Sequence, residues 1–491
     1  MRARHVVILG LDGVPPEAFN SLFDQGLMPY TKHLWGRLWV SPMAVDLPFT
    51  LASWTAISTG VNPGKHGIFD FVEPRPGGGL SVVTREKLER PTVNEMVAVN
   101  GFDTITINVP MTYPPSVKSH CIVVADWTSP YRGKAWPPEE AERAARLMPS
   151  EPLKAYTLEG YLEALTRSME HRLELLEYYY TRRKWRLFYT VIPETDWAFH
   201  RIYGDLVNRG RASRAARRLF SLIDRAVRLI YENMPDDTLF IAVSDHGFME
   251  ATKCLNGNIL LARAGLLKTR PQAVNLRSRI LLAAARLLPA SLRHRLKYRL
   301  QAFFEAIGAA DAFRVARIPI DYAASRAYMT ISYNIYVNPG LKGEEREETR
   351  RMVYELFRKY SEMFRTLSYR EEYFSGPYVG RGPDIVVIPA HGYNVSTRLA
   401  SRSIVEEGRW YVHSDTAFIA MNTEPPEEAR PPVSWDIAPT VLAALGLPLD
   451  PAFDGKPLVT PMQGVGARSY SFIARLWRLR RRLAGLGAGK T

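Results

Sequence analysis

Cysteine is scarce in this chain, which has only Cys121 and Cys254 among its 491 residues. Two cysteines cannot form a disulfide framework, so we exclude the small disulfide-rich secreted domains and expect a reducing compartment, the cytoplasm. Long apolar runs are also missing, because no stretch reaches the roughly 18 apolar residues of a membrane-spanning helix. The first apolar run ends at Asp12 with no small-residue cleavage site after it, so we expect a β-strand there and not a signal peptide.

Acidic residues are absent from two segments, 271–300 and 461–491, which carry seven Lys or Arg each. These 14 residues account for the net charge of +14, since the rest of the chain has 50 basic and 50 acidic residues. The second segment has one apolar stripe on its expected helix: Phe472, Leu476, Leu479 and Leu483. A basic helix with such a stripe is typical of membrane surfaces. We therefore expect 461–491 to contact anionic lipid peripherally, at the inner membrane face. A solvated arm is the alternative, and no motif for nucleic-acid recognition is evident.

Short apolar runs that alternate with helical patterns predict the fold. With 46% hydrophobic and 23% charged residues, the composition is that of a globular protein. Nearly continuous apolar runs are typical of parallel strands buried on both faces, and they occur at 5–10, 104–108, 122–125, 185–192 and 238–243. Helical patterns lie between them, including an amphipathic helix over 213–231, and a charged helix is expected over 344–368. The chain is thus predicted to be α/β, with a doubly wound, mostly parallel sheet and helices on both faces.

The charge pattern divides this prediction into four parts. We expect residues 1–268 to form the first part of the core and 316–460 the second part. The basic segment 269–315 is predicted to be a helical insertion or cap between them. The basic amphipathic tail is predicted to cover 461–491.

Polar residues follow two of the expected strands directly. Asp12 ends the first strand, and ligands gather at the carboxyl edge of open α/β sheets, although an Asp there can also cap the next helix. Asp245 and His246 follow the strand at 238–243. Neighbouring side chains on a strand point to opposite faces, so both can reach one site only if the chain turns. Gly247 would permit that turn.

Thr50 lies where a polar loop gives way to the helical run Leu51–Ser58, and Gly60 stands just past the end of that run. This is the pattern of an N-cap residue. The free N–H groups and the positive dipole at a helix start favour an anion beside such a hydroxyl. Taken alone, Thr50 can equally be a simple cap.

Asp196 and His200 are four residues apart in the sequence TDWAFH, which places both on one face of a helix and allows them to hold one ion. A solvated Asp–His pair is the alternative. A further imidazole, His413, follows Trp410 and Tyr411. With Asp12, Thr50, Asp245 and His246 these residues are too many for one ion and suit two. Their mixed nitrogen and oxygen ligands favour zinc, with manganese or iron as alternatives, and two metals suit in-line phosphoryl displacement.

Several short motifs occur in order along residues 5–460: LDG at 11–13, LPFT ending at Thr50, TG nine residues after Thr50, PGKHGI, TDWAFH, SDHGF, DIAPT and DGKPL. Together they resemble the type I phosphodiesterase/nucleotide pyrophosphatase family of the alkaline phosphatase superfamily. The resemblance implies an alkaline-phosphatase-like fold and two divalent metal ions. It also implies phosphate diester or pyrophosphate substrates.

The resemblance assigns a role to each residue of the set. It implies one metal held by Asp12, Thr50, Asp245 and His246, and another held by three residues: Asp196, His200 and His413. Thr50, deprotonated on its metal, would attack phosphorus, and water would hydrolyse the resulting phosphothreonine. A threonine nucleophile disfavours a sulfatase, which would use Cys or Ser, and a phosphoglycerate mutase, which would use Ser. No arginine is evidently placed to bind a dianionic monoester, which favours diesters.

Substrate-binding residues are less clear because the chain departs from nucleotide-cleaving relatives. Those relatives often place an Asn about twenty residues after the nucleophile, where this chain has Phe69, Asp70 and Phe71. A carboxylate there would repel phosphate, so Asn108 is the expected substitute. Lys65 is a second expected phosphate contact, with turn formation and packing as the alternative for PGKHG.

Three hypotheses follow for function. The first is a metal-dependent hydrolase of phosphate diesters or pyrophosphates that forms a phosphothreonine at Thr50. The second keeps this site in a phosphotransferase acting on membrane lipid or polyol head groups. The third is a non-catalytic membrane-surface module with a structural metal site. The sequence does not indicate the oligomeric state.

Overall fold

The computed structural model describes residues 3–131, 133–147, 157–270, 320–399, 401 and 403–487. The expected basic insertion at 269–315 therefore lies outside the described residues except for its first two positions. Within the described ranges, every helix is too short or too polar to cross a lipid bilayer.

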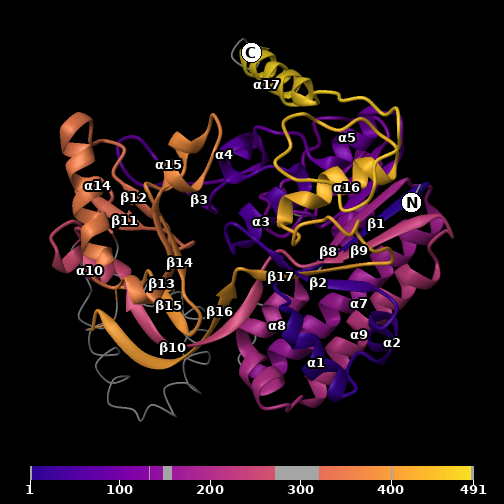
Figure 1. Ribbon diagram of the computed structural model, residues 1–491, viewed down its shortest axis with the longest axis horizontal. Helices are drawn as coiled ribbons and strands as arrows, with labels where there is room; N and C mark the ends of the chain where they lie inside the picture. Colours follow the sequence, from indigo (N-terminus) through magenta and orange to yellow (C-terminus); the bar gives the residue numbers. More distant parts are fainter. Residues whose placement is uncertain are drawn as a thin grey trace.

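An eight-stranded sheet forms the centre of the main lobe (Figure 1). Its strands follow one another in the order β2 (Trp39–Ala44), β17 (Thr416–Met421), β9 (Thr238–Val243), β1 (His5–Leu11), β8 (Leu187–Ile192), β5 (Thr104–Ile107), β6 (Cys121–Val124) and β7 (Ala135–Trp136). The five strands from β9 to β6 are parallel, whereas β2, β17 and β7 pair in the antiparallel sense. The predicted mostly parallel sheet is confirmed.

Helices cover both faces of this sheet, which is why its central strands are apolar on both sides. Val7, Leu9 and Leu11 of β1 pack against one layer of helices. That layer contains α1 (Pro16–Asp24), α2 (Pro29–Trp35), α6 (Ala141–Leu147), α7 (Leu158–Arg182), α8 (Glu194–Tyr203) and α9 (Arg214–Glu232). Val6 and Ile8 face the opposite layer, formed by α3 (Thr50–Thr59), α5 (Val93–Val99), α16 (Ile437–Ala444) and the first turn of α17 (Ser471–Gly487). The doubly wound arrangement predicted from the sequence is therefore present.

A second lobe with its own apolar core lies beside the main sheet (Figure 1). Its four-stranded sheet has the order β11 (Ala327–Met329), β12 (Ile335–Val337), β14 (Ile385–Pro389) and β13 (Phe364–Tyr369). Three helices belong to this lobe: α10 (Gly257–Arg263), α14 (Gly343–Arg358) and α15 (Arg370–Tyr373). The charged helix expected over 344–368 is shorter than predicted, because residues from Phe364 onward pair with β14 instead of continuing the helix.

A three-stranded sheet joins the two lobes. Its order is β15 (Tyr393–Ser396), β10 (Gly247–Asn256) and β16 (Val405–Ser414). In the antiparallel pair β10–β16, Phe248 lies opposite His413 at one end and Cys254 lies opposite Glu406 near the other. The hairpin β3 (Val72–Pro74) and β4 (Leu80–Val82) and the short helix α4 (Pro63–His66) complete the connection between α3 and α5.

Candidate active site

The seven predicted site residues come from five parts of the chain that meet at the carboxyl edge of the main sheet. Asp12 follows β1, and the pair Asp245–His246 links β9 to β10. Helix α8, which follows β8, carries Asp196 and His200. The remaining two are Thr50, at the start of α3, and His413, on β16. The structure thus brings together residues that are up to 401 positions apart in the sequence.

The first group of potential ligands is fully buried. His246 Nε2 lies 3.6 Å from Asp12 Oδ1 and 3.5 Å from Asp245 Oδ2. The ligand atoms of these three residues all lie within 4.8 Å of one another, which suits one metal ion. Thr50 Oγ1 is 3.4 Å from the same His246 Nε2. The hydroxyl therefore lies beside the buried group.

The second group is closer to solvent. Asp196 Oδ1 lies 3.4 Å from His200 Nε2 and 3.3 Å from His413 Nε2, and the two imidazole nitrogens are 3.1 Å apart. The side chain of His200 is 45% exposed, so this group can exchange with water. The rings of His246 and His413 stack at 3.7 Å, which makes the two groups adjacent.

Buried carboxylate oxygens that lack hydrogen-bond donors indicate that these residues fit a cation. Asp12 Oδ1, Asp196 Oδ1 and Asp245 Oδ2 are buried and accept no hydrogen bond. Burial and the neighbouring carboxylates raise the pKa values of Asp12 and Asp245 well above the usual range. Burial and the nearby His413 lower the pKa of His246, which keeps the imidazole neutral and able to bind a metal. Buried charges need a partner, so the residues fit divalent cations.

The sequence had suggested that Thr50 is the N-cap of its helix, but Thr50 lies one residue inside the helix. Phe49 is the N-cap, with an extended backbone at φ −133° and ψ 128°, and Thr50 is already helical. Its hydroxyl makes no cap hydrogen bond and instead faces His246. The first N–H groups of α3 have no partner within the helix, so an anion beside Thr50 would meet these donors. The simple capping role is therefore wrong for Thr50.

Asp12 has no capping role either. Helix α1 begins at Pro16 with Pro15 as its N-cap and has no side-chain cap hydrogen bond. The carboxylate of Asp12 instead accepts a hydrogen bond of 2.9 Å from the indole N–H of Trp54. The alternative offered by the sequence is thus excluded.

Backbone and side-chain contacts fix the orientation of the potential ligands. The Gly13 amide donates to Asp245 Oδ1 at 3.1 Å. His246 Nδ1 lies 3.1 Å from the Gly247 carbonyl, and His413 Nδ1 lies 3.0 Å from the Pro48 carbonyl. An N–H on each Nδ1 leaves Nε2 as the free nitrogen that faces the site. The site is therefore held in shape by the protein itself.

Gly247 serves the site by its small size. It does not adopt a positive φ, and the chain bends at Asp245 instead. A Cβ atom on Gly247 would lie 2.3 Å from the Thr416 carbonyl oxygen and 2.6 Å from Ser414 Oγ. The predicted turn is present, but glycine is needed there because β17 and β16 pass so close.

The residues expected to bind substrate lie in different places. Asn108 follows β5 at the same sheet edge, where its side-chain amide donates to the Val191 carbonyl at 3.1 Å and its Oδ1 is buried without a donor. Lys65 forms an ion pair of 2.5 Å with Asp454. Helix α3 separates it from Thr50, and ten helical residues span about 15 Å. The structure therefore does not bring Lys65 to the cluster.

The sequence had suggested that the Asp70 carboxylate would face the phosphate of a bound substrate, but in the structure it has other partners. The carboxylate is buried and accepts hydrogen bonds from the hydroxyl of Thr330 and, at 3.4 Å, the amide of Ser332 in the second lobe. The expected repulsion of substrate by this residue therefore does not arise. Asp70 holds the turn before β12 against the main lobe.

Three aromatic residues of the site were not found from the sequence. Trp54 binds Asp12 from one helical turn beyond Thr50, a spacing that could have signalled a shared face. Phe248 contacts both His200 and His413, with ring centroids 4.9 and 5.1 Å away. Tyr333, whose φ is 61°, meets Phe49 at 5.5 Å across the two lobes, and only the tertiary fold reveals it.

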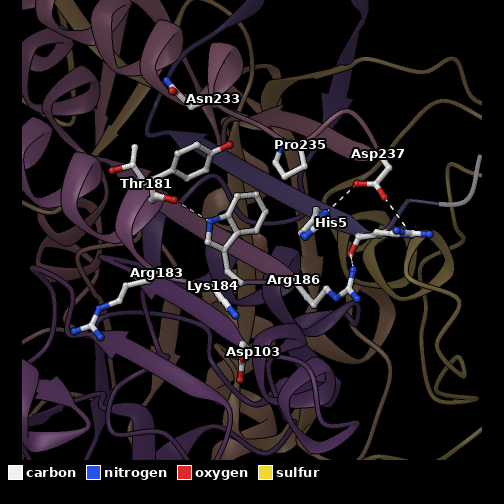
Figure 2. Close-up of a pocket in the computed structure, with 12 residues that line it drawn as sticks. His5, Asp103, Thr181, Arg183, Lys184, Arg186, Asn233, Pro235 and Asp237 are labelled. Carbon is white, nitrogen blue, oxygen red and sulfur yellow. Dashed lines mark hydrogen bonds and ion pairs between the residues drawn. The ribbon is translucent and has the colours of Figure 1, made fainter.

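A separate pocket of about 720 Å³ lies at the opposite, amino-terminal edge of the sheet (Figure 2). His5 and Asp237 pair there at 3.0 Å, and Arg186 donates to the Arg4 carbonyl at 2.9 Å. These residues satisfy one another and offer no group of potential metal ligands among the described residues. The chemistry therefore lies at the carboxyl edge, away from this pocket.

The sequence matches the profile of one protein family. The family is described as type I phosphodiesterase / nucleotide pyrophosphatase, and the match covers residues 6–410. A search of curated proteins finds no match to this chain.

Solved structures with a similar fold include three phosphate- and phosphonate-related proteins. Phosphonoacetate hydrolase from Sinorhizobium meliloti 1021, in complex with phosphonoformate, has a TM-score of 0.55 at 15% identity over 90% of this chain and 96% of that one. The alkaline phosphatase PafA has a TM-score of 0.54 at 15% identity, with 93% and 98% covered. Murine ectonucleotide pyrophosphatase/phosphodiesterase 5 has a TM-score of 0.50 at 11% identity, with 96% and 99% covered. These likenesses show an alkaline-phosphatase-like fold.

Proposed function

Because the chain belongs to the type I phosphodiesterase/nucleotide pyrophosphatase family of hydrolases, we propose that it hydrolyses phosphate diesters or pyrophosphates with Thr50 as the nucleophile. The observation that carries this proposal is the position of the Thr50 hydroxyl, 3.4 Å from His246 Nε2 and beside the group Asp12, Asp245 and His246. Among the described residues this hydroxyl has no other hydrogen-bond partner, and Phe49, not Thr50, is the N-cap of α3.

The proposed cofactors are two divalent cations, with zinc as our choice and manganese or iron as alternatives. Asp12, Asp245, His246 and Thr50 would hold one of them. The second would be held by three residues: Asp196, His200 and His413. When bound there, the cations would polarise the phosphate and favour the deprotonated forms of nearby hydroxyl groups and water.

The proposed reaction proceeds in two displacements. In the first, Thr50 Oγ1 loses its proton and forms a bond to phosphorus, while the bond from phosphorus to the leaving oxygen breaks and that oxygen takes up a proton. In the second, water attacks the phosphothreonine, and the Thr50 hydroxyl is restored. The first N–H groups of α3, which have no partner within the helix, would donate to the non-bridging phosphate oxygens.

Diesters and pyrophosphates remain our preferred substrates over monoesters. Among the described residues, the hydrogen bonds and ion pairs of the seven site residues involve no lysine or arginine side chain that could neutralise a second negative charge. We propose Asn108 as the substrate-binding amide, because it lies at the same sheet edge with a buried Oδ1 that lacks a donor. We retain a cytoplasmic location, with peripheral membrane contact through 461–491, as part of the proposal.

A substrate panel tests this function. Purified chain loaded with zinc, manganese or iron would be assayed on monoesters, diesters, dinucleotides and, because one structural neighbour is a phosphonate hydrolase, phosphonates. We expect a diester such as bis-p-nitrophenyl phosphate to be cleaved and Thr50→Ala to lose activity while still binding metal. Thr55→Ala is the matched control, since Thr55 lies on the same helix and donates to the Leu51 carbonyl.

Two results would redirect the proposal. Full activity in Thr50→Ala would remove Thr50 as the nucleophile. A phosphorylated alcohol formed in preference to hydrolysis when an alcohol acceptor is added would make the protein a phosphotransferase.

A further inference from the structure

The helix α17 is tied to the main lobe only through one side. Tyr470, just before the helix, and Ile473 in its first turn are buried in the same apolar cluster as α16, and Ala474 is buried as well. Arg478 forms an ion pair with Glu89 on that lobe. Figure 1 shows the helix at the edge of the molecule, with the C-terminus at its far end. These contacts hold the helix in a defined orientation, and no described residue covers its other side.

Leucines form the free side of the helix. Leu476, Leu479 and Leu483 are 48%, 53% and 60% exposed. At about 100° per residue they fall within an arc of about 60°. Phe472, which the sequence had placed on the same stripe, packs partly against the core. The exposed stripe therefore consists of the three leucines.

Arginines border this stripe on both sides. At the same rotation per residue, Arg475 and Arg480 lie on either side of the leucines, and both are exposed. No acidic residue occurs anywhere in 461–491. Long arginine side chains can keep their charge at the level of lipid head groups while apolar residues enter the acyl region. The charge of this surface complements an anionic layer.

From this arrangement we propose that the exposed face of α17, formed by Leu476, Leu479, Leu483, Arg475 and Arg480, docks on the surface of an anionic phospholipid membrane. The leucines would enter the interface and the arginines would contact lipid phosphates. Because the opposite side of the helix is buried in the main lobe, docking would fix the whole enzyme on the membrane in one orientation. The inference does not depend on the proposed hydrolysis, since vesicle binding is measured without substrate.

Vesicle sedimentation tests the proposal with the full chain. The probes are vesicles of phosphatidylcholine alone and vesicles with phosphatidylglycerol added. We expect binding to the anionic vesicles, weakened by salt because exposed charges are screened. Leu479→Glu should weaken this binding by at least ~10-fold, because it places a charge in the inserted face. The double change Arg475→Gln with Arg480→Gln should cost about 10-fold on anionic vesicles, because each cation near the surface adds attraction.

Matched variants separate docking from general effects. Leu158→Glu changes an equally exposed leucine, 46% exposed at the start of α7, and should leave vesicle binding unchanged. Hydrolysis of a small water-soluble diester, or the thermal unfolding midpoint if no substrate is found, should be the same in Leu479→Glu and wild type and so shows that the variant is folded.

Three outcomes would overturn the proposal. The first is unchanged vesicle binding in Leu479→Glu. The second is equal binding to neutral and anionic vesicles. The third is a wild-type dimer that does not bind vesicles and that Leu479→Glu converts to a monomer, because the leucines would then meet a second copy of the chain.

Discussion

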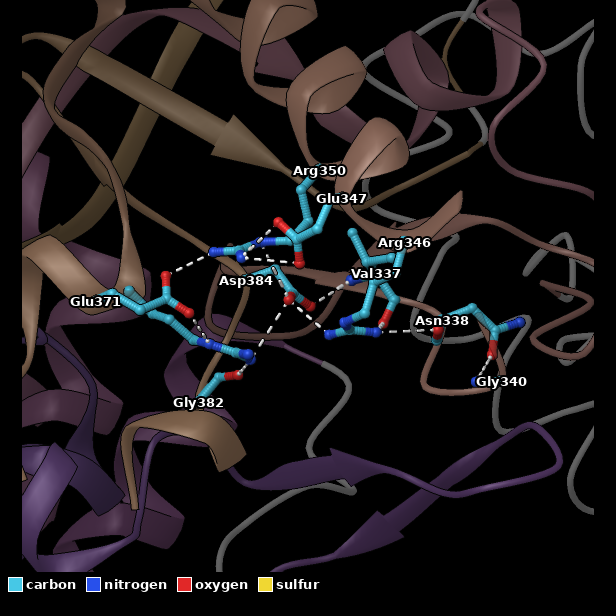
Figure 3. A network of polar contacts seen from close by, with 10 residues as sticks. Val337, Asn338, Gly340, Arg346, Glu347, Arg350, Glu371, Gly382 and Asp384 are labelled. Atoms are coloured by element: carbon cyan, nitrogen blue, oxygen red, sulfur yellow. Dashed lines mark hydrogen bonds and ion pairs between the residues drawn. The ribbon is translucent and has the colours of Figure 1, made fainter. Parts of the chain in front are cut away.

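Buried carboxylates in two regions of the molecule differ in whether all of their oxygens have hydrogen-bond donors. In the second lobe, Asp384 is 1% exposed, and each of its two oxygens has a donor (Figure 3). Its oxygens receive the Val337 amide at 2.8 Å and Arg346 at 2.6 Å, with Arg370 at 3.4 Å and Arg350 at 3.6 Å. At the edge of the main sheet, Asp12 and Asp245 are equally buried, but each has one oxygen without a donor.

We interpret the difference as one between a structural carboxylate and proposed metal ligands. Buried charges are stable only when they are paired, either with other residues or with a metal. Asp384 finds its partners within the protein and links α14, β12, β14 and α15. Asp12 and Asp245 lie near each other and Asp196, so burial and mutual repulsion disfavour their charged forms, and a bound cation would offset this cost.

The largest effect is expected from replacing Asp245, one of the two buried carboxylates that have an oxygen without a donor. Asp245→Asn should lower the rate of diester hydrolysis by more than the about 100-fold typical of losing an outer partner of a metal site. It should also reduce the metal content of the purified protein. In the presence of a chelator the same variant should melt at or above the wild-type temperature, because one of three mutually repelling carboxylates is gone.

The control for that experiment is Asp103→Asn, which removes an exposed carboxylate paired with His120 far from the site. It should change neither metal content nor rate. Asp245 would be a structural residue like Asp384 if its replacement destabilised the metal-free protein and left metal binding intact.

Replacing Asp384, whose two oxygens both have donors, should lower stability and leave metal binding unchanged. Asp384→Asn leaves three arginines around a neutral group and should reduce the free energy of unfolding by about 3 kcal/mol, measured by urea denaturation. Metal content should stay at the wild-type level. Glu347→Gln, which removes a 58% exposed partner of Arg350, should cost less than about 1 kcal/mol. Loss of metal in Asp384→Asn would contradict the distinction drawn between Asp384 and the pair Asp12 and Asp245.

A smaller effect is expected from removing Trp54, whose indole N–H donates to the Asp12 carboxylate. Trp54→Phe keeps most of the ring but removes the N–H that fixes the carboxylate, so zinc affinity should fall about 10-fold in a chelator competition. Trp185→Phe is a matched control, because its indole donates to the Tyr180 carbonyl at the opposite edge of the sheet. Unchanged zinc affinity in Trp54→Phe would show that this indole only packs.

The last prediction concerns Asp46, where the effect of a substitution on stability should depend on pH. It lies four residues before Thr50, one of its oxygens is buried without a donor, and burial together with Asp454 raises its pKa to about 7. The unfolded chain loses this proton near pH 4 whereas the folded protein keeps it to about pH 7, so the stability contributed by the residue falls across that range. Asp46→Asn cannot ionise and should therefore be more stable than wild type at pH 8, by up to the roughly 4 kcal/mol that a shift of about three pKa units allows.

At pH 4 the same substitution should have little effect, because Asp46 is protonated in the folded protein and only about half ionised in the unfolded chain. Thermal unfolding midpoints of both proteins between pH 4 and pH 8 measure the difference. A constant difference across this range would show that Asp46 is already ionised in the folded protein, with a partner that satisfies it.

The sequence was informative where chemistry follows directly from a strand or a helical spacing. Asp12 and Asp245 each end an apolar run, so a parallel sheet had to bring them to one edge. Asp196 and His200 are one helical turn apart, and the structure shows them facing the same point. The fold class rests on the same periodicity and is confirmed. Roles in catalysis stay predictions.

Contacts between distant segments could not be predicted. Asp70 was expected to face phosphate, but it binds Thr330, which is 260 residues away. Lys65 was expected to bind phosphate, but Asp454 neutralises it across the fold. The second lobe was also missed, because its strands have the same local pattern as the core and only pairing assigns them to a separate sheet. Local sequence patterns contain no information about such partners.

The paired strands β10 and β16 connect the two lobes directly. One end carries His413 and Phe248 at the candidate site, and at the other end β10 pairs with β15 and leads into α10 of the second lobe. The contact between Phe49 and Tyr333 provides a second attachment, next to Thr50. A tilt of the outer lobe would therefore move an imidazole that lies 3.3 Å from Asp196. Any substrate large enough to press on that lobe would change the geometry of the candidate site.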